Sequence, residues 1–144
     1  MVAEDPYRFF TFEVTYGQIS PLGVSQRGIF INGKFPGPTI YCITNDNNRN
    51  FIKQRKTSWQ DGVLGTNCPI PPNSNWTYQM QMKDQIGTYS YFPSTKMHRA
   101  VGGFGAINIR ARVVIFVPYL KPVEEFTLLI SDWWKSDKKL FSNH

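Results

Sequence analysis

Apolar and polar residues alternate along much of this 144-residue chain, and this period of two constrains its fold more than any other feature. In residues 10–16 every second side chain is apolar, and residues 76–82 repeat the pattern. Successive side chains of a β-strand point to opposite faces, so this alternation predicts strands with one buried face. Helical periodicity is nearly absent, and the sequence therefore predicts an all-β fold.

Turn signals divide the rest of the chain into further short segments. Asn32-Gly33 readily adopts positive φ angles and predicts a tight turn, while three prolines within residues 67–73 exclude regular structure there. Further strands are predicted over residues 28–31, 39–44, 88–92, 106–110 and 126–130, and a short helix over residues 132–140. About seven short strands separated by turns are typical of a β-sandwich or a partly closed barrel.

The length and the composition predict one domain, residues 1–144. A chain of 144 residues with 41% apolar side chains can close a single hydrophobic core. The longest apolar run, residues 113–117, is far shorter than the roughly 20 residues that cross a bilayer, so we expect no membrane span. The first seven residues lack the basic start and apolar run of a secretory signal, so the chain is expected either to remain unexported or to have lost a leader.

The chain is basic, with 16 Lys and Arg against 10 Asp and Glu and a formal net charge of +6. This charge favours acidic partners: nucleic acid, anionic polysaccharide or an anionic membrane surface. Aromatic side chains at strand spacing can stack on bases but more often belong to a core; those in question are Trp76, Tyr78, Tyr89 and Tyr91. We therefore expect no nucleic-acid partner.

Residues that carry out catalysis are sparse. His98 is the only imidazole apart from the terminal His144, so a hydrolytic triad has to be built on His98 with Ser94 and Asp84 nearby in sequence. Such neighbours occur by chance in most domains. Residues 102–105 are glycine-rich but lack the Lys-Ser/Thr of a phosphate loop, and they predict a tight turn with close backbone packing. No cysteine or histidine spacing fits a zinc site, and a blue-copper site lacks its second histidine.

Two cysteines and one sequon are candidates for covalent modification. Cys42 and Cys68 can form one disulfide, remain two thiols, or bridge to partners outside the chain, and their spacing does not decide among these. Asn75-Trp76-Thr77 is an N-glycosylation sequon at the entry to a predicted strand, so we expect Asn75 to be glycosylated if the chain enters the secretory path.

Five segments together resemble the N-terminal plastocyanin-like domain of plant multicopper oxidases, in particular the pollen-specific and skewed-growth subfamily of L-ascorbate oxidase homologues. The segments are residues 3–17, 28–38, 58–62, 67–72 and 87–92. The resemblance covers nearly the whole chain. It implies a cupredoxin-like Greek-key β-sandwich, copper as the family's cofactor, secretion to the cell wall, and normally three such domains.

The chain departs from the family pattern at the copper ligands. Oxidases of the family carry two ligand histidines in a Gly-Thr-Tyr-Trp-Tyr-His-Ser-His motif, and the resemblance places Phe92 and Ser94 at those positions. The other motif, His-Trp-His-Gly, has no counterpart, because two strands between Asn48 and Phe51 are absent from the sequence by this comparison. We therefore expect no metal ligands, no catalytic residues, no bound copper and an incomplete sandwich, with the family's later domains absent.

These observations lead to a hypothesis of function and two alternatives. The first is a non-catalytic, cupredoxin-like domain of a secreted protein, associated through the resemblance with cell-wall expansion and pollen tube growth. The second is a copper-binding oxidoreductase, and the third is a basic module that binds acidic wall polysaccharide. The resemblance also implies that Cys68 bridges to another domain or molecule, and the missing strands predict self-association through exposed strand edges.

Overall fold

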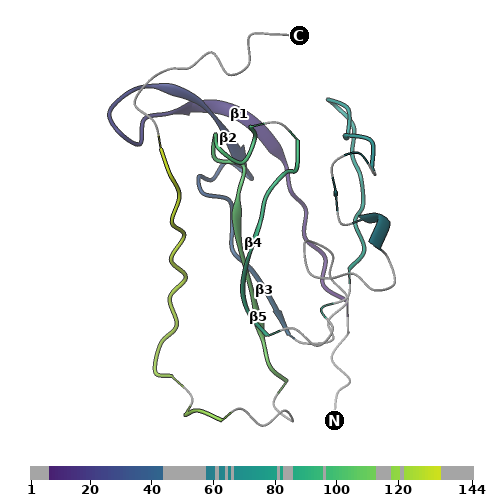
Figure 1. The fold of residues 1–144 in the computed structure, drawn as a ribbon, viewed down its shortest axis with the longest axis vertical. Coiled ribbons are helices and arrows are strands. Elements are labelled where there is room, and N and C mark those ends of the chain that lie inside the picture. The colour runs from purple at the N-terminus through teal and green to yellow at the C-terminus, as the bar shows by residue number, and fades with distance from the viewer. Residues whose placement is uncertain are drawn as a thin grey trace.

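The fold was analysed in a computed structural model, which describes residues 7–43, 58–60, 62, 63, 65, 67–80, 82, 86–95, 97–112, 118–120 and 122–133. Its elements are β1 (Val14–Ile19), β2 (Gln26–Ile31), β3 (Ile40–Ile43), the short 3₁₀ turn η1 (Ser58–Gln60), β4 (Gly87–Tyr91) and β5 (Gly105–Arg110) (Figure 1). The fold is all-β, as predicted. Within these residues, no helix is long and apolar enough to cross a membrane.

Strands β1 and β2 form an antiparallel ribbon in which Gly17 pairs with Gly28. A Cβ on Gly17 would lie 2.5 Å from the Phe30 ring, and one on Gly28 would lie 2.3 Å from the Ile19 side chain. Both glycines therefore leave space that a cross-strand side chain fills.

The predicted turn after β2 is confirmed. Asn32 and Gly33 have φ angles of 52° and 68°, and the backbone amides of Ile31 and Lys34 each donate to the other residue's carbonyl at 3.1 Å. The Asn32 side chain also accepts from the Glu13 amide at 2.7 Å, which holds the turn against the chain that enters β1.

The second sheet has the strand order β3-β5-β4, with β3 parallel to β5 and β4 antiparallel to it. One face of this sheet forms the core, because alternate side chains of each strand point inward. The core cluster comprises Ile31, Ile40, Cys42, Met80, Met82, Tyr91, Ile107 and Ile109, with Phe12 and Tyr89 packed against it. The inner faces of three strands thus meet the end of β2 and the segment around residue 80.

Two of the predicted strands are wrong. Residues 76–80 and 82 are in no strand; the Gln79 amide donates to the side chain of Gln60 at 3.1 Å instead of to a neighbouring strand. Residues 126–130 also form no strand, and Leu128 and Ile130 are 80% and 86% exposed. In both segments the alternation is present, but no backbone partner for a ladder occurs within the described residues.

Other boundaries and faces differ from the prediction. The first strand begins at Val14 instead of residue 10, and the apolar face predicted to be buried is largely open, with Val14 62% and Tyr16 51% exposed. Asp132 and Trp133 are not helical, and the rest of the predicted helix lies outside the described residues. The predicted deletion between Asn48 and Phe51 lies outside them too.

Candidate functional site

The region where the family resemblance expects copper ligands begins at the end of β4, at the buried Tyr91. The Tyr91 hydroxyl donates to the Pro38 carbonyl oxygen at 2.8 Å, and its ring stacks on Phe12 with centroids 5.2 Å apart. A Cβ on Gly37 would lie 2.5 Å from that hydroxyl, and a Cβ on Gly105 would lie 2.3 Å from it. Because both residues are glycines, the hydroxyl fits between the two backbone segments. Burial raises the pKa of Tyr91 to about 12, because the phenolate would lose its hydration.

Phe92 and Ser94 follow directly on Tyr91. The guanidinium of Arg99 lies over the Phe92 ring, 4.1 Å from its centroid, and Ser94 is exposed. A phenyl ring has no lone pair to donate to copper, and a neutral serine hydroxyl is a poor substitute for imidazole. These two side chains do not fit the family's metal.

His98 is held by hydroxyl groups on both ring nitrogens. Nδ1 lies 2.9 Å from Thr95 Oγ1, and Nε2 lies 3.3 Å from the Tyr16 hydroxyl. The Tyr16 ring is in turn covered by the Arg27 guanidinium, 4.1 Å from its centroid. His98 therefore ties the turn after β4 to strand β1, which is a structural role.

No metal-binding cluster occurs in the part of the chain that the structure describes: it contains no group of three or more His, Cys, Asp or Glu side chains placed to hold an ion. Of the hydrolytic triad considered from the sequence, His98 contacts the Thr95 and Tyr16 hydroxyls, and Asp84 lies outside the described residues.

The glycine-rich segment is the tight turn that the sequence predicts. Gly102 has φ of +100°, and a Cβ there would lie 2.1 Å from the Phe35 ring. The Gly103 amide donates to the His98 carbonyl oxygen at 3.0 Å. Glycine is therefore needed at Gly102 because the Phe35 ring packs against the backbone there. The turn does not have the structure of a phosphate-binding loop.

The four aromatic side chains that the sequence analysis singled out differ in how far they are buried. Tyr89 packs against the core and Tyr91 is buried, as predicted, whereas Trp76 and Tyr78 are 63% and 38% exposed, so their assignment to the core was wrong. These two lie on residues 76–80, which pair with no strand among the described residues.

The cysteines do not pair with each other. Cys42 is 1% exposed within the core, while Cys68 is exposed on the proline-rich connector. Asn75 is also exposed, so its amide is accessible to modifying enzymes.

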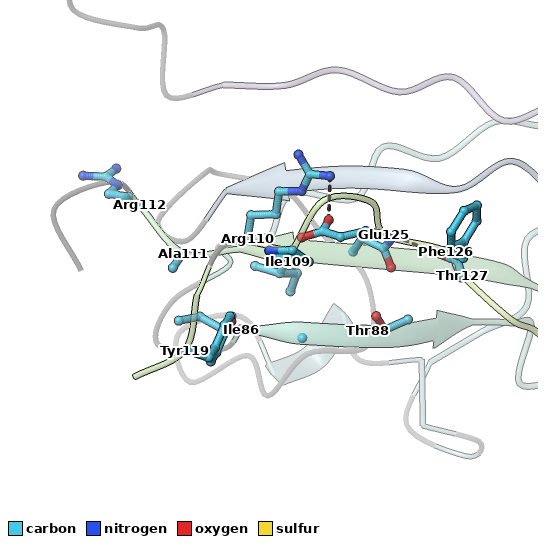
Figure 2. A pocket seen from close by; sticks show the side chains of 13 residues that line it. Ile86, Thr88, Ile109, Arg110, Ala111, Arg112, Tyr119, Glu125, Phe126 and Thr127 are labelled. Atoms are coloured by element: carbon cyan, nitrogen blue, oxygen red, sulfur yellow. Dashed lines mark hydrogen bonds and ion pairs between the residues drawn. The ribbon is translucent and has the colours of Figure 1, made fainter. Parts of the chain in front are cut away.

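An open groove of about 510 Å³ lies on the face of the β3-β5-β4 sheet opposite the core, and the sequence analysis missed it (Figure 2). Residues 125–127 run along β5 there in the antiparallel direction and are held by side chains. Arg110 donates to Glu125 at 2.6 Å, and Asn108 Nδ2 donates to Thr127 Oγ1 at 2.7 Å. The sequence does indicate this polar face, because Asn108 and Arg110 alternate with Ile107 and Ile109 along β5.

Comparison with known proteins agrees with the fold. The family model described as multicopper oxidase matches residues 13–50 and 48–113, which is most of the chain. The chain belongs to the multicopper oxidase family. The strand arrangement agrees, since the chain is similar in structure to a laccase from Botrytis aclada, with a TM-score of 0.63 at 28% identity, covering 72% of this chain and 22% of the laccase. Fet3p, described as a multicopper oxidase that functions in iron import, gives a TM-score of 0.64 at 24% identity and shares the fold, with 78% of this chain and 24% of that one covered.

Plant members of the multicopper oxidase family are more similar in sequence. The chain is 49% identical to an L-ascorbate oxidase homologue of Nicotiana tabacum over 96% of its own length, and 52% identical to the monocopper oxidase-like protein SKU5 of Arabidopsis thaliana over 92%. It spans 28% and 25% of these relatives, about a quarter of their length. The fold is therefore that of a cupredoxin-like multicopper oxidase domain, and copper is the metal for which the family is named.

The two stretches matched by the family model meet at residues 48–50. The aligned stretch with the tobacco relative is 154 residues long, which exceeds the 144 residues of this chain, so at least ten of the relative's residues have no counterpart here.

Proposed function

We propose that this chain is a non-catalytic, cupredoxin-like domain that acts by binding, as part of a secreted plant protein related to multicopper oxidases. The observation that carries the proposal is the pair Phe92 and Ser94 at the end of β4. The resemblance assigns these positions to copper-ligand histidines. The Arg99 guanidinium lies 4.1 Å from the centroid of the Phe92 ring, and the Ser94 side chain is exposed to solvent.

The proposed absence of copper rests on ligand chemistry. Copper sites in proteins are built from imidazole, thiolate and thioether groups in fixed geometry. His98 is the one imidazole close to β4 in sequence, and its two nitrogens contact Thr95 and Tyr16. The second ligand motif of the family requires a segment between Asn48 and Phe51, and we propose that two strands are deleted there.

The proposed location is the plant cell wall, and the proposed process is cell expansion and pollen tube growth. Support comes from the identity of 49% to the tobacco L-ascorbate oxidase homologue and of 52% to SKU5. In an extracellular setting Asn75 is proposed to carry a glycan, and Cys68 to form a disulfide with another domain or another molecule.

Oxygen consumption tests the proposal directly. The full chain is incubated with copper(II) and then freed of unbound metal, and ascorbate or a phenol is added as the electron donor. We expect oxygen uptake no faster than in a buffer blank treated in the same way. Turnover that scales with protein concentration, alongside an active laccase as the positive control, would establish the oxidoreductase alternative instead.

A further inference from the structure

We propose that the groove on the outer face of the β3-β5-β4 sheet binds an acidic oligosaccharide, a chain of sugar rings that carry carboxylates. The inference deepens the proposed role in binding and rests on it. Arg110 and Arg112 meet the carboxylates, the exposed Thr88 hydroxyl hydrogen-bonds to a sugar hydroxyl, and Tyr119 and Phe126 provide ring faces at the rim.

The groove follows from the alternation of β5. Ile107 and Ile109 point into the core and are 0% and 2% exposed, which turns Asn108 and Arg110 to the opposite face. Thr88 of β4 pairs with Asn108 in the register, so its side chain lies on the same outer face. A strip of amide, hydroxyl and guanidinium groups therefore lines the floor, as Figure 2 shows for Thr88 and Arg110.

Asn108 holds the floor of the groove through its side-chain amide. Its Nδ2 donates to Thr127 Oγ1 at 2.7 Å, and its buried Oδ1 has no hydrogen-bond partner among the described residues. A buried acceptor without a donor is costly, and most such groups in folded proteins are satisfied. Asn108 Oδ1 is closed to solvent, so a ligand reaches the exposed Thr88 hydroxyl beside it and not this oxygen.

The charges in the groove favour a carboxylate. Arg110 and Arg112 line it together with a single acidic residue, Glu125. The side chains of the Arg110–Glu125 pair are 61% and 52% exposed, and an exposed pair contributes only about 0–1 kcal/mol. A ligand carboxylate can therefore exchange with Glu125 at little cost, and the planar guanidinium matches it with two parallel hydrogen bonds.

The aromatic rings distinguish a sugar from a simple anion. Tyr119 and Phe126 are 62% and 87% exposed, and Figure 2 places them toward opposite ends of the groove. Large exposed rings beside polar groups mark binding surfaces. Sugar rings present flat C–H faces to such side chains while their hydroxyls reach the polar floor.

Calorimetric titration of the full chain with a short oligomer of galacturonic acid tests the proposal. We expect saturable binding that weakens with salt, and no comparable binding of a neutral galactose oligomer or of a polyglutamate peptide. Equal binding of the neutral oligomer or of the peptide would overturn the acidic-sugar assignment, and so would failure of the acidic oligomer to bind.

Matched charge variants place the binding in the groove. Arg112→Gln and Arg110→Gln should each weaken binding about tenfold, since a charge-assisted hydrogen bond is lost. Lys34→Gln removes the same charge from the turn after β2, outside the groove, and should change the affinity less than about twofold. Equal losses in all three variants would refute the groove and leave only diffuse charge attraction.

Amide chemical shifts of the wild-type chain provide a readout that needs no variant. Titration with the acidic oligomer should move the amide signals of Thr88, Asn108 and Thr127, and unmoved signals at these residues would refute the groove even if a variant fails to fold. The oxygen-uptake assay is separate from this one, so oxidase turnover would refute the non-catalytic proposal without altering the outcome for sugar binding.

Discussion

Replacing Tyr91 by phenylalanine tests the packing at the end of β4. The substitution keeps the ring that stacks on Phe12 at 5.2 Å and removes only the hydroxyl that donates to the Pro38 carbonyl oxygen at 2.8 Å. Tyr91 is 4% exposed, so water cannot readily replace the lost donor. Leaving such an acceptor without its partner costs about 1–3 kcal/mol of the free energy of unfolding.

For a chain near 150 residues this corresponds to a fall of roughly 3–10 °C in the unfolding midpoint. Urea denaturation should show a lower midpoint concentration with an unchanged slope, because the buried surface is unchanged. Tyr41→Phe is the matched control, since Tyr41 is 54% exposed and should lose less than about 0.5 kcal/mol. Equal losses from the two variants would refute the account of Tyr91.

The raised pKa of Tyr91 predicts that the stability of the fold depends on pH at alkaline values. Burial raises this pKa from 10.0 to about 12, so between these values the unfolded chain releases a proton that the folded chain keeps. The stabilising contribution is complete below pH 10 and is lost as the pH rises toward 12. Wild type should therefore lose stability faster than Tyr91→Phe across this range, and parallel pH profiles would show that the pKa is not raised.

Three further predictions concern the surface and the proposed deletion. Expression behind a signal peptide should attach a glycan at Asn75, so glycosidase treatment should increase electrophoretic mobility for wild type and not for Asn75→Gln; an unchanged wild-type mobility would contradict occupancy. Cys68 is exposed and Cys42 is buried, so oxidising conditions should give disulfide-linked dimers that Cys68→Ser abolishes, and dimers that persist in this variant would contradict the assignment. Inserting the family's segment between Asn48 and Phe51 should raise the unfolding midpoint by several degrees, because each large apolar side chain it covers contributes about 1.5–3 kcal/mol. A sharp monomeric melt of the present chain above about 60 °C would instead indicate a closed core.

The sequence predicted correctly those strands that are followed by a recognisable turn motif. The strand over residues 28–31 is found as part of β2, because the Asn32-Gly33 turn that ends it is set by the φ preferences of those two residues. The strand over residues 106–110 is β5 extended by one residue. The all-β class and the cupredoxin-like sandwich were likewise predicted from alternation and from the family resemblance.

Alternation did not predict whether a segment has a partner. Residues 76–82 alternate most regularly, yet Met80 and Met82 enter the core while Trp76 stays 63% exposed, because a strand also needs a neighbouring backbone that is distant in sequence. The strand predicted over residues 126–130 is absent for the same reason. This segment contacts β5 through the Thr127 side chain, which accepts a hydrogen bond from Asn108.

The alternation of β5 indicates a polar outer face, but it does not predict what covers that face. The groove depends on residues 125–127 running along β5, and the contacts that place them join Arg110 to Glu125 and Asn108 to Thr127. Neither pair has a spacing that a strand or a helix would predict. Phe92 and Ser94, by contrast, are assigned through a local motif, so their assignment depends on no contact that is distant in sequence.

We propose that Phe92 and Ser94 leave this domain without a copper site, and copper content per chain measures this directly. Purified chain is incubated with excess copper(II), dialysed against a weak chelator and analysed for metal and protein. We expect copper to remain far below one ion per chain, less than about 0.1, because no imidazole occupies either position. Retention of about one or more tightly bound copper ions per chain would contradict it.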